Sequence, residues 1–201
     1  MAETLTATSP LAGWSEKFAH LAPTVTLREE PFVAMVDLWA DPDGPAASQA
    51  SAILGLDLPT TPSTYVSDDT LTAIWMGPDE WLITAGASSA AALETALRAA
   101  VGEHGGAAID VSAQRTTLRL SGPNARDVLA KGCSLDLHPK VFTKGTAAQT
   151  MLALAGVVLI ALDDAGTDYR VLVRASFARY LADWLIDAAE EFGVPARASS
   201  P

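Results

Sequence analysis

The longest apolar run in the sequence, Met151–Leu162, is the strongest constraint on the fold. Its twelve residues are too few to cross a bilayer as a helix, so the run has to be buried inside a folded protein. With its surroundings it divides into three strand-like segments, Ala148–Leu154, Gly156–Leu162 and Asp168–Arg174, with the turn cluster Asp163–Thr167 before the last. This pattern predicts a three-stranded meander.

The meander is followed by the clearest helical pattern in the chain. We expect Ser176 to cap this helix, and Gly193 with Pro195 to end it. Apolar residues recur at a spacing of 3.6 and predict the buried stripe: Phe177, Tyr180, Leu181, Trp184, Leu185, Ala188 and Phe192.

Two further groups of strands each lead into a helix. Leu71–Met76 and Glu80–Ala85 predict a hairpin around Gly77-Pro78-Asp79, and the next helix is expected to be capped by Ser88 or Ser89. Thr116–Leu120 alternates like a half-buried strand, and Ser121-Gly122-Pro123 turns it into a helix with proline at an early position. Pro31–Ala40 predicts one more strand. The fold class is therefore α+β, with antiparallel or mixed sheets that carry helices on one face.

A chain of 201 residues corresponds to one large domain or two small interlocked ones. We expect residues 1–30 to form an irregular N-terminal arm and residues 31–195 a single α+β domain. Its possible internal halves are 31–104 and 105–195. Residues 196–201 are expected to fray.

Charge and composition limit the function. The net charge of −11 repels phosphate backbones, so a nucleic-acid partner is not expected. Only 18% of residues are charged and 38 are alanine, which favours burial against a partner chain. No segment predicts a membrane span. The single cysteine, Cys133, excludes an internal disulfide and favours a reducing, cytoplasmic setting.

The familiar catalytic motifs are missing from the sequence. It has no G-x-S-x-G, Walker A or G-x-G-x-x-G motif, and its three histidines lie far apart, so we expect no metal site. Cys133 is either a structural thiol or one activated by Lys131. Asp68 and Asp69 are either turn residues or an acid/base pair.

Tryptophans and one arginine are the remaining candidates. Trp75 and Trp81 flank the hairpin turn, where they could stack on a flat ligand or anchor a core edge or a protein interface. Arg115, between two strand-like segments, could clamp a carboxylate or remain solvated.

Several motifs carry a resemblance to known families. Trp81–Lys131, with Leu120-Ser121-Gly122-Pro123-Asn124-Ala125 leading into Val128-Leu129, resembles the aminomethyltransferase (T-protein) superfamily. A closer resemblance, to the gamma subunits of heterotetrameric sarcosine oxidases, covers nearly the whole chain. It is carried by Ser9-Pro10-Leu11, Trp75–Leu82, Asp110–Thr116, Leu129–Pro139, Phe142, Gly145, Gln149-Thr150 and Tyr169–Phe177.

The resemblance implies an aminomethyltransferase-like folate-binding-domain fold and a complex of alpha, beta, gamma and delta subunits. Such complexes oxidatively demethylate sarcosine to glycine, form hydrogen peroxide, and pass the one-carbon unit to tetrahydrofolate as methylenetetrahydrofolate. The resemblance places FAD, FMN and NAD in the alpha and beta chains, the folate-handling domain in alpha and zinc in delta. It implies no cofactor in the gamma chain.

The sequence also departs from the related enzymes. The C-terminal barrel of a T-protein has no counterpart here, and the family's catalytic acid aligns with Asp69 or Thr70. Related iron–sulfur assembly proteins have a Lys-Gly-Cys-Tyr-x-Gly-Gln-Glu motif, whereas Lys131-Gly132-Cys133 continues here as Ser134-Leu135-Asp136. Folate chemistry and cluster assembly therefore do not transfer residue by residue.

Two hypotheses follow. In the first, the chain is a non-catalytic subunit that docks on a larger flavoprotein chain through the arm around Trp14, the Trp75/Trp81 hairpin and Arg115. In the second, it is a free-standing folate-binding protein that uses Asp69 as the acid and Arg115 on the glutamate tail of folate.

Overall fold

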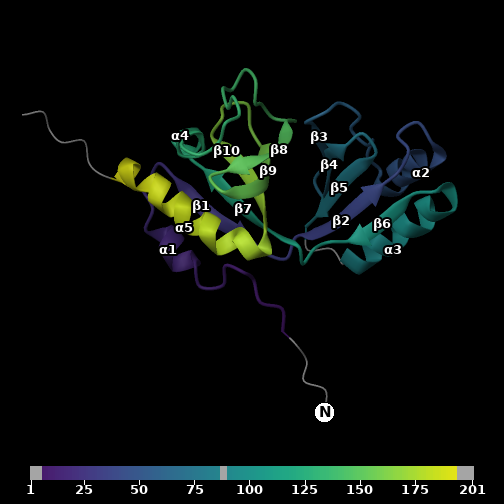
Figure 1. The fold of residues 1–201 in the computed structure, drawn as a ribbon, viewed down its shortest axis with the longest axis horizontal. Coiled ribbons are helices and arrows are strands. Elements are labelled where there is room, and N and C mark those ends of the chain that lie inside the picture. The colour runs from purple at the N-terminus through teal and green to yellow at the C-terminus, as the bar shows by residue number, and fades with distance from the viewer. Residues whose placement is uncertain (1–5, 87–89, 194–201) are drawn as a thin grey trace, which may run out of the picture.

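The computed structural model describes residues 6–86 and 90–193 and contains two five-stranded antiparallel sheets (Figure 1). Sheet A has the order β1 (Thr26–Glu30), β7 (Arg115–Ser121), β10 (Asp168–Arg174), β9 (Ala155–Ala161) and β8 (Ala147–Leu152). Sheet B has the order β3 (Tyr65–Ser67), β4 (Leu71–Gly77), β5 (Glu80–Ala85), β2 (Ala34–Trp39) and β6 (Ala107–Asp110). The predicted hairpin is β4–β5 and the predicted meander is β8–β9–β10, so both are confirmed.

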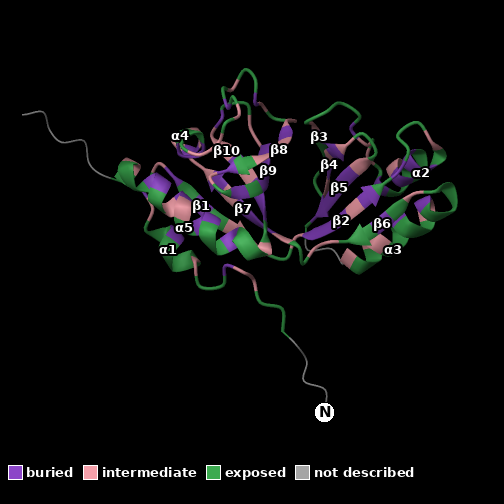
Figure 2. Cartoon of the chain, viewed as in Figure 1, coloured by how far each residue is buried: buried purple, intermediate pink, exposed green. Residues whose placement is uncertain are grey.

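Helices pack on the outer face of each sheet. Sheet A carries α1 (Ser15–Ala19), α4 (Ala125–Ala130) and α5 (Ala178–Ala189), and sheet B carries α2 (Pro45–Leu54) and α3 (Ala90–Val101). Single 3-10 turns lie at Gly102–His104 (η1), Ala175–Phe177 (η2) and Glu190–Gly193 (η3). Buried residues concentrate on the helix faces that meet the sheets (Figure 2). The predicted α+β class is confirmed.

The details of α5 correct the expected stripe. Its buried residues are Ala178, Leu181, Ala182, Leu185, Ala188 and Ala189. Phe177 and Tyr180 are exposed, because the helix begins only after η2 and its inward stripe starts at Ala178. Ser176 does not cap it: the residue at the N-cap is Phe177, with no side-chain cap bond. The expected caps Ser88 and Ser89, the closing Pro195 and the tail 196–201 lie outside the described residues.

The N-terminal arm is more ordered than expected. The prediction of irregular structure is wrong for α1 and for β1, which pairs with β7 from Thr26↔Ser121 to Glu30↔Thr117. Leu27 is the one buried residue of β1, because β1 is an edge strand with polar neighbours on both sides of that leucine. Leu11 is buried in the core of sheet A, and the Ser9 hydroxyl donates to the Glu29 carboxylate.

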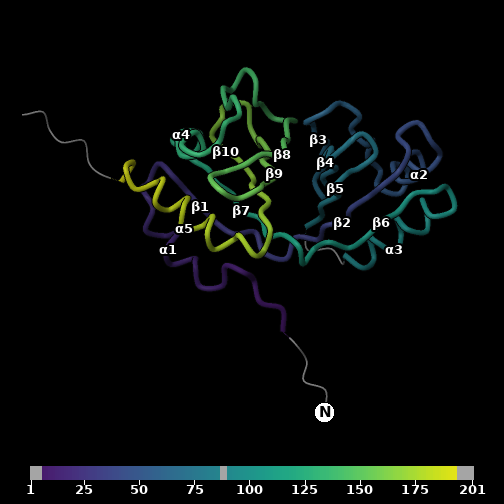
Figure 3. Tube along the Cα trace, viewed as in Figure 1, coloured from purple at the N-terminus to yellow at the C-terminus, as the bar shows by residue number. Residues whose placement is uncertain are grey.

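The sheets do not divide at the expected halves. β6 lies after residue 104 yet belongs to sheet B, and β1 lies before residue 31 yet belongs to sheet A. Figure 3 traces the two crossings, between β1 and β2 and between β6 and β7. The boundary between the expected halves 31–104 and 105–195 therefore does not coincide with the boundary between the sheets, because the chain crosses from one sheet to the other twice.

A separate apolar cluster joins the inner faces of the sheets. Sheet B contributes Met35, Tyr65, Ile74, Met76 and Leu82, and sheet A contributes Ala147, Val158, Ile160 and Leu172. Hydrogen bonds close one side of this contact. The Tyr65 hydroxyl donates to Ala161 O at 2.7 Å, and Gln149 Nε2 donates to Met76 O at 2.8 Å. The backbones of Ser63–Tyr65 and Gly145–Ala147 also pair.

The turn from β7 into α4 depends on Gly122. Its φ is +118°, and a Cβ added there would lie 2.3 Å from Thr24 O. The same carbonyl accepts the Asn124 amide, while the Gly122 amide donates to Thr167 O. The helix begins at Ala125 with Asn124 at the N-cap, so Pro123 lies just outside it rather than at an early helical position.

Replacing Gly122 with alanine should destabilise the chain strongly, because the strained φ and the collision with Thr24 act together. We expect Gly122→Ala to lower the free energy of unfolding by about 2–4 kcal/mol in urea denaturation. Gly102→Ala is the control, since its added Cβ meets nothing within 4 Å, and its effect should stay within about 0.5 kcal/mol. Equal effects of the two variants would contradict this account of the turn.

Candidate functional site

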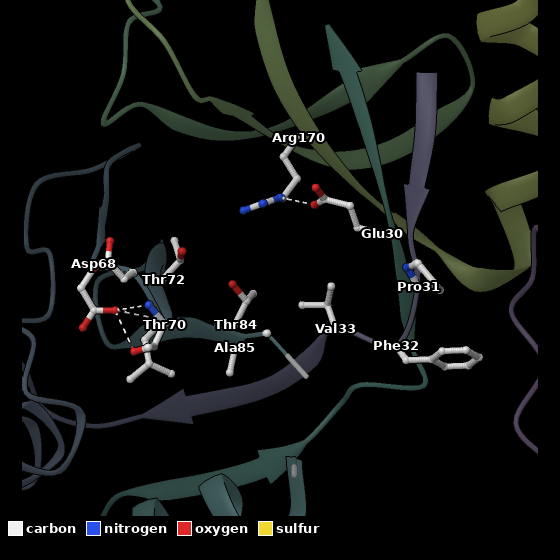
Figure 4. A pocket seen from close by; sticks show the side chains of 13 residues that line it. Glu30, Pro31, Phe32, Val33, Asp68, Thr70, Thr72, Thr84, Ala85 and Arg170 are labelled. Carbon is white, nitrogen blue, oxygen red and sulfur yellow. Dashed lines mark hydrogen bonds and ion pairs between the residues drawn. The ribbon is translucent and has the colours of Figure 1, made fainter. Parts of the chain in front are cut away.

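A cavity of about 830 Å³ opens between the two sheets at the β1–β2 connection (Figure 4). Glu30 and Arg170 line it from sheet A. Residues 31–33, 68–72 and 84–86 line the rest. Its volume lies in the range typical of small-molecule sites.

Three arginines lie side by side on the inner face of sheet A, and one of them, Arg170, lines the cavity. Arg28, Arg119 and Arg170 are in register on the neighbouring strands β1, β7 and β10. Like charges directly opposite each other destabilise a sheet, so this row needs counter-ions. We call these three residues the arginine row.

Two carboxylates neutralise the arginine row. Glu30 lies 2.7 Å from Arg170 Nε, 3.3 Å from Arg28 Nη2 and 3.8 Å from Arg119 Nη1. Asp168 accepts a bidentate pair of hydrogen bonds from Arg119, and this contact raises the pKa of the Arg119 guanidinium. Arg170 thus bonds Glu30 through Nε, while its terminal nitrogens point into the cavity (Figure 4).

The opposite wall contains the acidic pair predicted from the sequence. One Asp68 oxygen accepts the Thr70 amide at 2.7 Å, the Leu71 amide at 2.8 Å and the Thr70 hydroxyl at 2.9 Å. These bonds lower the pKa of Asp68, as is expected of an acid that builds a turn. Asp69 lines the cavity.

Arg115 lies away from this cavity. It is four residues before Arg119 on β7, a separation of about 13 Å along a strand. Its neighbour across the strands is Arg174, and the acids nearest to it on sheet B are Asp37 and Glu80. The structure therefore does not bring Arg115 together with Asp69.

The predicted tryptophans are mostly part of the protein's own core. Trp81 is completely buried, and its Nε1 donates to Pro59 O at 2.7 Å, so it cannot form a docking surface on this chain. Trp75 is its cross-strand partner and is half-buried. Trp14 is half-buried against the core of sheet A, with the Lys17 ammonium 4.3 Å from its ring centre.

Sequence reasoning missed two exposed aromatic residues. Trp39 is 41% exposed at the end of β2, and Phe32 is 61% exposed with φ +58° between β1 and β2. The sequence predicted a strand over Pro31–Ala40, but the strand starts only at Ala34, so Phe32 lies before it. The turn residues Asp41–Pro45, which follow Trp39 and Ala40, were the available signal that Trp39 lies near the end of a strand.

Cys133 is half-buried and packs against the core of sheet A, in a bridge pair with Leu152. This is the environment of a structural thiol. Within residues 6–86 and 90–193, no group of three or more histidine, cysteine, aspartate or glutamate side chains could hold a metal ion. No helix in these ranges is long and apolar enough to cross a membrane.

Removing the central counter-ion should expose the repulsion within the arginine row. Because Glu30 faces all three guanidiniums and is only 20% exposed, we expect Glu30→Gln to lower the free energy of unfolding by about 1–2 kcal/mol. The loss should shrink in 1 M NaCl, which screens the arginines. Glu94→Gln is the matched control, since Glu94 is equally buried but faces Arg98 alone. A loss at Glu30 that is no larger than the loss at Glu94 would contradict this role.

Glu80 should make stability fall as the pH rises. Burial and the neighbouring Asp37 carboxylate raise the pKa of Glu80 above its ordinary 4.5. The folded chain then holds the proton more tightly than the unfolded chain, so stability is lost from about pH 4.5 up through the folded pKa. We expect Glu80→Gln to be more stable than the wild type at pH 7 and equal to it at pH 4 in urea titrations. An advantage that is greatest at pH 4 would contradict the sign.

Sequence comparisons place the chain among known proteins. The model of the sarcosine oxidase, gamma subunit family matches residues 39–191. The sarcosine oxidase subunit gamma of Corynebacterium sp. (strain U-96) is 40% identical over 169 residues, which are 84% of this chain and 80% of the relative. The subunit of the same name from Corynebacterium sp. (strain P-1) is 38% identical over 187 residues, 92% of this chain and 90% of the relative.

Solved structures agree with these matches. A chain of the heterotetrameric sarcosine oxidase from Corynebacterium sp. U-96, in complex with pyrrole 2-carboxylate, has a TM-score of 0.89 and 36% identity; the match covers 96% of this chain and 99% of that one. The glycine cleavage system aminomethyltransferase T from Bartonella henselae has a TM-score of 0.59 and 19% identity over 89% of this chain and 50% of that one, a likeness of fold alone. The chain belongs to the sarcosine oxidase gamma subunit family.

Proposed function

We propose that this chain is a non-catalytic subunit of a heterotetrameric sarcosine oxidase and that its role is to dock on and support the subunits that carry the chemistry. One observation supports this above the others. Asp69 lines the cavity between the sheets, whereas Arg115 lies on β7 about 13 Å from Arg119, the residue directly opposite the cavity-lining Arg170. The two residues that the folate-binding hypothesis needs are held at different ends of the space between the sheets.

The resemblance to sarcosine oxidase gamma subunits supplies the partners and cofactors of this proposal. The partners in the proposal are alpha, beta and delta subunits. FAD, FMN and NAD belong to alpha and beta, the tetrahydrofolate-handling domain to alpha and zinc to delta. In this division of labour the gamma chain assists the oxidative demethylation of sarcosine through contacts with its partners. The proposal includes a cytoplasmic location, because a chain with a single cysteine and no internal disulfide suits a reducing compartment.

A free-standing folate-binding protein is the second candidate, and the cavity itself favours it. The cavity is large enough for a cofactor-sized ligand, and Asp69 is on its wall. Its arginine, however, is already bonded to Glu30 through Nε, and Asp68 is occupied by its own turn. The charged groups left for a ligand are the Arg170 terminal nitrogens and the Asp69 carboxylate, beside the hydroxyls of Thr72 and Thr84.

Purification from the native gene context distinguishes the two candidates. We expect the tagged chain to bring down three partner chains in fixed proportion, with flavin absorbance and sarcosine-dependent peroxide formation. The result that contradicts the proposal is a lone chain of 20.9 kDa that binds tetrahydrofolate in calorimetry.

A substitution at Asp69 tests whether this chain takes part in the chemistry. We expect the complex that carries Asp69→Asn to keep its turnover within about twofold, because we propose that Asp69 is neither a general acid nor a general base. Removing such a group normally lowers the turnover rate by roughly 10²–10⁴-fold. Asp43→Asn, another exposed turn acid, controls for the change in charge. A loss in the 10²–10⁴ range at Asp69 alone would overturn the non-catalytic role and support the folate-binding hypothesis.

A further inference from the structure

A second pair of arginines lies on the inner face of sheet A. Arg115 on β7 and Arg174 on β10 are directly opposite each other in the register. They share this face with the arginine row, so five of the nine arginines of an acidic chain lie on one face of one sheet. The buried Thr117 and Leu172 separate the pair from the row.

The two arginine clusters differ in how their charge is balanced. The arginine row contacts Glu30 and Asp168 directly. Within the described residues, Arg115 and Arg174 have no carboxylate within ion-pair distance, 4.0 Å. Asp37 and Glu80 on sheet B, with Asp79 beyond Glu80, are the nearest acids. Partial burial and the charge of Arg174 lower the pKa of the Arg115 guanidinium, so its charge is poorly compensated within this chain.

An apolar surface lies on sheet B beside Asp37, which is one of the acids nearest to Arg115. Trp39 and Ile109 are 41% and 51% exposed. Trp39 lies two residues after Asp37 on β2, so their side chains point to the same face of the sheet. Ile109 shares that face, because it is the cross-strand partner of Asp37. Trp39 Nε1 donates to Asp37 Oδ2 at 3.2 Å, which holds the indole in place. β6, which carries Ile109, is an edge strand of sheet B.

We propose that Trp39, Ile109, Arg115 and Arg174 form the surface on which a partner subunit docks. The occupant is a segment of the partner that places a carboxylate on the arginine pair and an apolar side chain on Trp39 and Ile109. We call these four residues the docking surface. The inference rests on the proposed function, because it names where the assembly contact is made.

Charge and composition argue for a protein partner with an acidic group. A carboxylate would give the arginine pair the counter-ion that the arginine row finds in Glu30, and arginine accepts it in a bidentate geometry. Tryptophan and arginine together are the residues that most often carry the energy of an interface. The four residues span two sheets and combine apolar area with charge, which a segment of protein can cover at once.

Competition within the complex tests the docking surface. Wild-type chain and one variant, distinguished by mass, are co-expressed with the native partners, and the complex is purified through a tag on another subunit. We expect Ile109→Ala and Arg174→Ala each to be incorporated at least about tenfold less than the wild type relative to their soluble amounts, which corresponds to about 1.4 kcal/mol of lost contact. Trp39→Ala should lose more.

Matched variants control for a general loss of apolar area or of positive charge. Ile53→Ala deletes the same groups from a residue of equal exposure, 51%, on α2, and Arg126→Ala removes an arginine from α4. Both should be incorporated like the wild type. Arg174→Lys should retain more incorporation than Arg174→Glu, and the advantage of the wild type over Arg174→Ala should shrink at high salt. Thermal unfolding of each purified variant identifies any that fold poorly.

Failures of the two proposals are distinguishable. If the wild-type chain does not enter a complex, the proposed function fails. If the wild type enters and Ile109→Ala and Arg174→Ala follow it equally, the docking surface is overturned while the proposed function stands. Equal losses at Ile109 and Ile53 also overturn it, because the effect would then not belong to this face.

Discussion

The structure depends on one small apolar contact between the inner faces of its sheets. Leu172, Val158 and Ile160 of sheet A meet Met35, Ile74 and Leu82 of sheet B. Each sheet already has its own core with its helices. The inner contact therefore decides how the sheets face each other, and the Tyr65 hydroxyl on Ala161 O fixes its position with a buried polar bond.

Charged residues lie on both sides of that contact because the sheets do not cover each other completely. On the cavity side, the arginine row is paired with Glu30 and Asp168 of the same chain. This pairing is needed because a partly buried charge that is left unpaired costs roughly several kcal/mol of stability. On the other side, Arg115 and Arg174 form no ion pair within the described residues. The exposed Trp39 donates a hydrogen bond to Asp37, which is one of the acids nearest to Arg115. The charges on the cavity side are thus balanced within the chain, whereas our proposal assigns the counter-ion of Arg115 and Arg174 to a partner subunit.

The sequence was a good guide wherever local chemistry decides the structure. Gly77-Pro78-Asp79 and Asp163–Thr167 located two sets of strands, and the apolar period located α3 and α5. The sequence was a poor guide wherever pairing with a distant strand decides the structure. β1 has a single buried residue and no alternation, so only its partner β7 makes it a strand. Trp81 and Trp39 look equally apolar in sequence, yet the first lies under α2 and the second at an open strand end.

The same limit applies to the site. Arg28, Arg119 and Arg170 lie far apart in the sequence, and only the antiparallel register of β1, β7 and β10 aligns them. Arg115 and Arg119 are four residues apart on the single strand β7, so the rise of the strand keeps them about 13 Å apart. No side-chain rotation changes the register, since a shift by one residue would turn the arginines of β7 into the apolar core. A fold shared with an aminomethyltransferase can thus be retained while its strands hold acid and arginine apart, which leaves binding to partners as the function that this face supports.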